Sequence, residues 1–335
     1  MKKYYYIILG SGLSGLLTAY RMANDVWFDE KEILIIDKEI KNQNDRTWCF
    51  WEESNGEFDS ILSKTWEKAF IGNQDFQQSF EMKPYLYKMI RSRDFYKLVF
   101  GTISSKSNFT FENDEIINWK TIEDSVEITG KNQSYFGLFL LNSFFDVKPI
   151  LNQKKYPYLK QHFIGWFIKT KEELFDDSEV KFMDFTIEQD GNTRFMYVLP
   201  TSKTEALFEY TLFSEDLLEK TEYENAISNY LQNIGITNYE IMEKETGNIP
   251  MTCFPFHNQN SERILFIGTA GGWTKASTGF TFFNSKKQSE KLVEFLKTNK
   301  NLSKFHQKNR YWFYDLILLE VLHQNNELGG QLFGT

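Results

Sequence analysis

The sequence predicts an α/β fold in which a first βαβ unit and a late strand–loop–helix unit flank an inserted, mostly antiparallel β-sheet. Residues 5–9 form an apolar run that ends in a glycine-rich turn, followed by a helical pattern and a second apolar run at 33–36. Residues 160–214 hold four apolar segments spaced about 10 residues apart, with Gly, Asp or Pro between them, as in an antiparallel meander. The run 263–267 then leads into a second glycine-rich loop and a helical pattern over 281–298.

The polar connection 146–158 marks the clearest boundary between segments. The 335 residues are enough for about two domains. We therefore expect four segments: the first part of a nucleotide-binding domain (1–158), an inserted substrate domain (159–248), a return segment (249–300) and a C-terminal helical segment (301–335).

The first glycine turn, GSGLSG, starts at Gly10, and the second apolar run ends in Asp37. This layout is typical of a Rossmann-like domain that binds the ADP half of a dinucleotide. Gly10 would make the tight turn, Gly12 would let the backbone approach the pyrophosphate, and Gly15 would let the helix pack on the sheet. The helix N-terminus favours the anion, and Asp37 would accept hydrogen bonds from a ribose. A non-binding glycine turn is the alternative, which the flanking strands and the acid disfavour.

Composition excludes several classes of protein. The net charge of −8 and the lack of a basic stripe argue against a nucleic-acid partner. Cys49, Cys253 and the four histidines show no ligand spacing, so we expect neither a metal site nor a disulfide. No secretory signal precedes the first strand, which makes a cytoplasmic location the default.

The apolar segments leave two questions open. None approaches the roughly 18 residues that cross a bilayer, and the pattern over 311–322 predicts an amphipathic helix that packs in the core or rests on a membrane surface. Aromatic residues make up 17% of the chain, which fits either an aromatic-rich core or a cavity for a large apolar or polyene ligand.

Several sequence words, in order, resemble the bacterial and plant type of lycopene cyclase, an FAD-dependent family related to the flavoprotein hydroxylases. They are KNQNDRTWCFWE (41–52), QHFIGWFI (161–168), FMDFT (182–186), RFMYVLP (194–200), LFEYTLFS (207–214), IPM (249–251) and IGTAGGWTKASTGFTF (267–282). The resemblance implies lycopene as substrate, reduced FAD as cofactor with NAD(P)H as electron donor, and cyclisation to β-ionone rings without net redox change.

The family's acid maps onto Glu209 in the word LFEYT. A carboxyl held among aromatic groups stays protonated near neutral pH. Strand alternation alone favours a solvent-facing Glu209 beside Leu207 and Thr211, and the family resemblance reverses that expectation. Asp184 and Glu188 are secondary candidates for the final base or for orienting Glu209, or are structural.

The resemblance also implies further cofactor contacts. Arg46 matches an arginine that contacts FAD in relatives, although a surface arginine is the alternative. Gly268 and Thr269 begin the late loop, where hydroxylase relatives carry Asp in place of Thr269. Gly279 and Phe280 would direct N–H groups toward the N1 edge of the flavin.

Two other functions share the expected fold: an FAD-dependent monooxygenase or reductase acting on a prenyl lipid, and an inactive carotenoid- or lipid-binding flavoprotein. Family members usually continue into a longer C-terminal helical tail, so we expect a truncated chain. The resemblance also implies peripheral contact with the inner face of a membrane. The sequence leaves open the number of ends cyclised, the choice between β and ε rings, and the oligomeric state.

Overall fold

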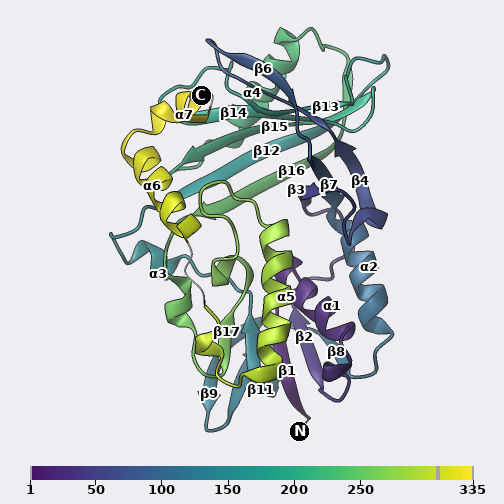
Figure 1. The fold of residues 1–335 in the computed structure, drawn as a ribbon, viewed down its shortest axis with the longest axis vertical. Coiled ribbons are helices and arrows are strands. Elements are labelled where there is room, and N and C mark those ends of the chain that lie inside the picture. Colours follow the sequence, from purple (N-terminus) through teal and green to yellow (C-terminus); the bar gives the residue numbers. More distant parts are fainter. Residues whose placement is uncertain (1, 307–309, 334–335) are drawn as a thin grey trace.

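The computed structural model describes residues 2–306 and 310–333. Figure 1 shows two halves stacked along the long axis, with the N-terminal strand in one half and a broad twisted sheet in the other. The expected α/β class is confirmed.

A mixed seven-stranded sheet forms the nucleotide-binding half, because the buried apolar runs of the first βαβ unit pair in parallel. Its strands in spatial order are β8 (Phe109–Asn113), β2 (Ile33–Asp37), β1 (Lys3–Leu9), β11 (Ser134–Asn142), β10 (Ser125–Gly130) and β9 (Ile116–Ile122), with β17 (Ile264–Phe266) pairing with β11. The return strand β17 thus joins the sheet that β1 began.

Helices α1 (Leu13–Ala23) and α5 (Phe282–Thr298) pack against each other on one face of this sheet. Their apolar faces join the sheet in one buried core, which includes Leu16, Leu17 and Leu292. The sequence predicted helix α5 over 281–298, and in the structure it starts one residue later, at Phe282. Helix α2 (Ser92–Ser104) contributes Phe95 and Val99 to the same core.

A second seven-stranded sheet forms the other half, and it is antiparallel except for the pairing of β13 with β5. Its strands in spatial order are β16 (Tyr239–Met251), β12 (Leu159–Thr170), β15 (Glu205–Ser214), β14 (Thr193–Pro200), β13 (Glu179–Asp184), β5 (Lys68–Gly72) and β6 (Gln77–Glu81). The last three apolar segments, β13, β14 and β15, form a meander, whereas the first, β12, pairs with β15 at its far side and not with β13, so the expected four-strand meander is wrong in this detail. Strands β5 and β6 come from within 1–158, so the first segment also contributes to this sheet.

Helices pack on both faces of the large sheet. Helix α4 (Lys220–Asn233) packs Ile227 and Leu231 on the face formed by Phe208 and Leu212. Helix α6 (Arg310–Gln324) buries Leu319 and Leu322, and the short α7 (Gly329–Phe333) follows it along β14. The helix α3 (Lys148–Leu151) lies between the two halves, on the same side of the molecule as α6 in Figure 1. None of the helices within the described residues is long and apolar enough to cross a membrane.

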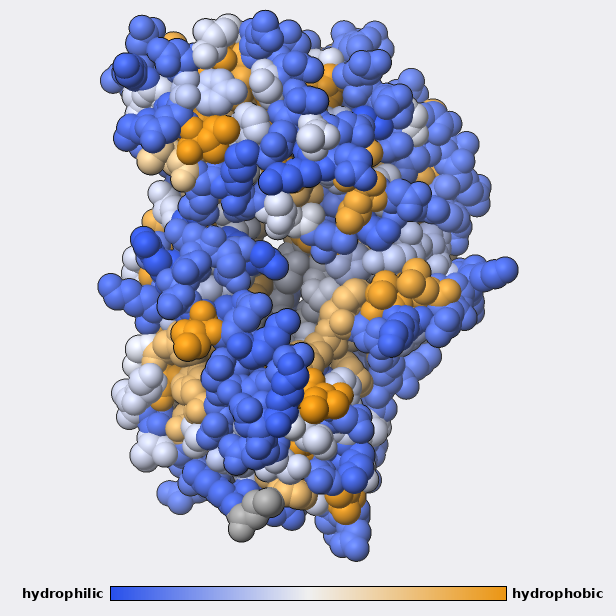
Figure 2. Space-filling view, turned by 180° about the vertical axis from the view of Figure 1, so that it is seen from behind, coloured by the Kyte–Doolittle hydropathy of each residue, from blue (hydrophilic) through white to orange (hydrophobic). Residues whose placement is uncertain are grey.

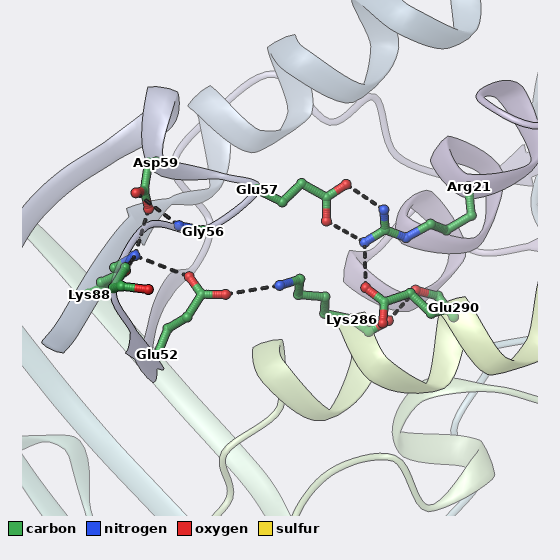
Figure 3. A network of polar contacts seen from close by, with 10 residues as sticks. Arg21, Glu52, Gly56, Glu57, Asp59, Lys88, Lys286 and Glu290 are labelled. Carbon is green, nitrogen blue, oxygen red and sulfur yellow. Dashed lines mark hydrogen bonds and ion pairs between the residues drawn. The ribbon is translucent and has the colours of Figure 1, made fainter. Parts of the chain in front are cut away.

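A small three-stranded sheet, β3 (Thr47–Glu53), β7 (Tyr85–Arg91) and β4 (Leu62–Trp66), is fixed to α5 by a charge network. The buried Lys88 ammonium donates to Asp59 at 2.7 Å and to Glu52 at 3.1 Å, and Lys286 of α5 binds the other oxygen of Glu52 at 2.9 Å (Figure 3). A buried cation with two carboxylate partners holds its position well. The network therefore positions β3 and β7, whose inner side chains reach the site described next.

Candidate active site

The first glycine turn has the geometry that a bound pyrophosphate needs. Gly10 has a φ of +92°, which L-residues with side chains rarely adopt. A β-carbon on Gly15 would lie 2.0 Å from the carbonyl oxygen of Gly10, so only glycine allows this approach of helix to strand. A β-carbon on Gly12 would meet nothing within 4 Å, and Gly12 borders the main cavity. The turn thus presents bare backbone to open space at the start of α1.

Asp37 lies at the end of β2 and is tied to the same turn. Its Oδ2 accepts hydrogen bonds from the N–H of Ser11 at 2.6 Å and from the Ser11 hydroxyl at 2.9 Å. Oδ1 accepts from the N–H of Glu39 at 2.9 Å. The carboxylate is half-buried beside the turn, although it does not border the main cavity.

The return loop meets the first turn directly. Gly268 has a φ of +63°, and a β-carbon there would lie 2.7 Å from the hydroxyl of Ser14. Thr269 shares a hydrogen bond of 3.1 Å with the Thr274 hydroxyl, and both Gly268 and Thr269 border the cavity. The loop and the turn therefore form one continuous edge of the same space.

The loop before α5 differs in one detail from the expectation. The N–H of Gly279 donates to the carbonyl of Lys275 at 2.9 Å, so this N–H is engaged within its own loop. Nearby, the side-chain oxygen of Gln161 and the hydroxyl of Thr278 are buried at the cavity without a hydrogen-bond partner among the described residues. Buried polar atoms are normally paired. These two groups are therefore placed to bind a polar ligand.

Arg46 occupies the rim of the cavity. Its N–H donates to the Ser92 hydroxyl at 3.1 Å, and its guanidinium binds the carbonyl of Asp45 at 2.5 Å. The side chain is exposed and borders the cavity, so its contact with FAD stays a prediction.

The cavity itself has a volume of about 1390 Å³ and runs between the two halves of the molecule. Figure 2 shows the surface hollowed there. The nucleotide-binding elements border one part of it, and the large sheet contributes Glu209, Tyr197 and Leu207 to another. A space of this size accommodates both a cofactor and part of a long ligand.

Glu209 lies on the cavity face of β15 and is 6% exposed. Its neighbours along the strand, Phe208 and Tyr210, pack against α4 on the opposite face of the sheet. The side chain of Glu209 therefore points into the cavity and not toward solvent. The Thr211 hydroxyl donates to Glu209 Oε1 at 2.7 Å. Burial, followed by the nearby charge of Glu245, raises the pKa of Glu209 to about 8, while the Thr211 hydrogen bond opposes the shift. Glu209 is therefore protonated near neutral pH.

Sequence reasoning missed Glu245. The strand register aligns Tyr197, Glu209, Gly165 and Glu245 in one row across β14, β15, β12 and β16. Glu245 borders the cavity and accepts a hydrogen bond of 2.7 Å from the Thr47 hydroxyl. The sequence offers one signal for Glu245: the alternating pattern of residues 239–249 places Glu245 and Gly247 on the same face of one strand.

Asp184 lies away from this row, on the other side of the sheet. The expectation that it acts as the final base or orients Glu209 is therefore wrong. Its carboxylate accepts from the Tyr230 hydroxyl at 2.6 Å and from the Thr186 N–H at 3.0 Å. It borders a separate cavity of about 750 Å³ behind the sheet, beside α4. The register of β13 against β14 shifts between Lys181 and Asp184, and this irregularity changes which side chains face the main cavity.

Aromatic side chains line the wall next to Glu209. The hydroxyls of Tyr87 and Tyr197 lie 2.5 Å apart, and Phe182 stacks parallel to Phe280 with ring centroids 6.1 Å apart. All four border the cavity. Burial also raises the pKa of the Cys49 thiol beside them to about 12, so the thiol stays neutral. The aromatic excess of the sequence therefore serves this cavity as well as the core.

Two nucleotide-binding segments and a sheet that closes a cavity define the fold class of flavoprotein hydroxylases and their relatives. Residues 6–316 match the family described as lycopene cyclase protein, and the chain belongs to that family. No protein with a curated description matches the sequence.

Solved structures share the fold at low sequence identity. A geranylgeranyl bacteriochlorophyll reductase-like protein from Thermoplasma acidophilum superposes with a TM-score of 0.67 at 12% identity, covering 100% of this chain and 88% of the other. The flavin-dependent brominase Bmp2 gives 0.65 at 12% identity, covering 99% and 94%. A variant of the halogenase PltM in complex with FAD gives 0.66 at 11% identity, covering 100% and 77%. These similarities concern the fold.

Proposed function

We propose that this chain is a lycopene β-cyclase that closes the ends of lycopene into β-ionone rings, giving γ-carotene and then β-carotene. The observation that carries the proposal is Glu209: a buried, protonated carboxyl on the wall of a large aromatic-lined cavity, in a chain of the lycopene cyclase family. Ring closure of a hydrocarbon needs an acid and surroundings that exclude water; Glu209 would supply the acid, and the aromatic wall beside it would exclude water.

In the proposed mechanism Glu209 donates its proton to the terminal double bond of the substrate. The resulting cation is attacked by the C5–C6 double bond, and loss of a proton completes the ring, so substrate and product have the same formula. Burial keeps water from the cation. The ring faces of Tyr87, Tyr197 and Phe182 are electron-rich and would stabilise positive charge beside Glu209.

The residues present fit a non-covalently bound FAD. Gly12 and the α1 N-terminus would hold the pyrophosphate, and Asp37 the ribose. The unpartnered Gln161 and Thr278 side chains would bind the flavin end. Reduced FAD, maintained by NAD(P)H, would supply an electron-rich ring next to the cation without being consumed.

Exposed apolar side chains support peripheral contact with the inner face of the membrane, where a carotenoid substrate resides. Leu151 and Leu217 are more than half exposed and border the cavity. Phe313, Tyr314 and Ile317 are also exposed, on α6. Flotation with liposomes tests this part of the proposal: the protein should float with the vesicles, and a protein that stays at the bottom at low and high salt contradicts it.

The decisive experiment is pigment analysis of lycopene-producing cells that express the chain. The proposal predicts γ- and β-carotene with the native chain and unchanged lycopene with Glu209→Gln. The competing function, an FAD-dependent monooxygenase or reductase acting on a prenyl lipid, predicts oxygenated or reduced products and stoichiometric use of NAD(P)H. An inactive binding protein would yield lycopene in both strains.

A further inference from the structure

Glu209 and Glu245 both border the cavity and flank one glycine of the large sheet. Gly165 of β12 pairs with Glu209 of β15 on one side and with Glu245 of β16 on the other. A β-carbon at Gly165 would lie 3.5 Å from the β-carbon of Glu209 and 3.3 Å from the γ-carbon of Glu245. The space over the glycine is taken by the Leu207 side chain, whose Cδ1 would lie 2.9 Å from that β-carbon. A glutamate side chain stands on each side, on strands about 10 Å apart.

The two carboxyls have different surroundings. Glu209 has apolar neighbours and a single hydroxyl donor, Thr211. Burial raises the pKa of Glu245 above its ordinary value, and Glu243 acts in the same direction, while the Thr47 hydrogen bond and the guanidinium groups of Arg91 and Arg46 favour the charged form. Two neighbouring buried carboxyls do not both ionise readily. The cationic neighbours lie on the side of Glu245, so Glu245 is the better placed of the two carboxyls to carry the negative charge and Glu209 to hold the proton, as an acid and a base in one site require.

We propose that Glu245 is the catalytic base that removes the final proton and so fixes the double bond of the ring; this inference rests on the cyclase function proposed above. The O–H bond of Glu209 breaks as a C–H bond forms at C2. The electron pair of the C5–C6 double bond then forms the C1–C6 bond and leaves the cation at C5. Glu245 takes the proton from C6, and the C6–H electron pair becomes the new C5–C6 double bond. One proton has moved from Glu209 to Glu245, and exchange with solvent after product release restores both groups.

The position of the base matters because the C5 cation can lose a proton from three carbons. Loss from C6 gives the β ring, loss from C4 gives the ε ring, and loss from the methyl group gives an exocyclic double bond. A fixed carboxylate two strands away from the acid selects one of these hydrogens by its position.

The test compares Glu245→Gln with Glu209→Gln as FAD-loaded proteins acting on lycopene in D2O. Glu245→Gln keeps the acid, so protonation continues while β-ring formation falls at least ~10²-fold. The cation then reverts, which places deuterium in recovered lycopene, or it loses another proton and gives ε or exocyclic rings. Glu209→Gln should give neither rings nor deuterium in lycopene.

Glu240→Gln is the matched control, since Glu240 lies exposed on the same strand. It should keep the wild-type rate. Glu245→Asp retains a base one methylene shorter and should cyclise slowly with the β-ring pattern unchanged, which provides a second readout if the amide variant folds poorly.

Two outcomes would overturn the assignment. One is a Glu245→Gln protein that forms β rings within about threefold of the wild-type rate, and the other is a folded, FAD-loaded variant that shows neither rings nor exchange. Failure of the proposed function is a separate result, because the wild-type protein would then form no ring from lycopene.

Discussion

Replacing Glu209 with glutamine should change how the stability of the protein depends on pH. The unfolded chain releases the Glu209 proton near the ordinary pKa of 4.5, whereas the folded protein retains it to about pH 8. The folded state therefore binds more protons across this window, and the contribution of Glu209 to stability is complete below pH 4.5 and is lost as the pH rises through about 8. Glutamine cannot ionise, so the variant escapes this loss.

The size of the effect follows from the shift. At about 1.4 kcal/mol per pKa unit, moving from 4.5 to about 8 corresponds to at most about 5 kcal/mol. Glu245 also loses a like-charged neighbour in the variant, which acts in the same direction at high pH. Relative to wild type, the variant should therefore gain several kcal/mol between pH 5 and 9.

The assay is urea unfolding of both proteins, at matched flavin content, at intervals from pH 5 to pH 9. Cyclisation by the wild type should decline over the same upper range as Glu209 ionises. A difference in unfolding free energy between the two proteins that stays constant within about 0.5 kcal/mol from pH 5 to 9 would refute a buried, protonated Glu209.

Three further substitutions test flavin binding, the positions of the two glutamates and the structural role of Asp184. Gly12→Val should leave folding intact, because its side chain enters open space, yet abolish flavin binding; full flavin content measured by absorbance would contradict the site. Gly165→Val should displace the Leu207 side chain, which a β-carbon would approach to 2.9 Å, and shift Glu209 and Glu245 beside it, lowering cyclisation at least ~10-fold at normal flavin content; unchanged turnover would show that the reaction does not depend on the positions of these two carboxyls. Asp184→Asn should lower the melting temperature, because it weakens the charged partner of Tyr230 and Thr186, while turnover per folded molecule stays near wild type; selective loss of turnover would return Asp184 to the active site.

Local sequence patterns were sufficient to predict those parts of the structure that are formed by residues close together in the sequence. The turn from Gly10 to Gly15 and the acid Asp37 follow from spacing, because a strand, tight turn and helix constrain each other within a few residues. The inward orientation of Glu209 followed from the family resemblance, since alternation alone favoured the solvent-facing one.

Long-range pairing set the features that the sequence did not reveal. Glu245 and Glu209 lie in one row of the sheet only because β16 and β15 both pair with β12. No local pattern specifies this register. Asp184 faces the other cavity because the register of β13 shifts before it. Strands β5 and β6 join the large sheet from far upstream, through the parallel pairing of β5 with β13.

The central claim is that this chain performs ring closure by proton transfer, without net oxidation or reduction. Its most direct test is anaerobic turnover of lycopene in D2O by protein whose flavin has been reduced once. We expect many cyclised products per reduced flavin, each with the formula of lycopene apart from deuterium at the protonated carbon. One reducing equivalent consumed per ring, or oxygen in a product made in air, would contradict it.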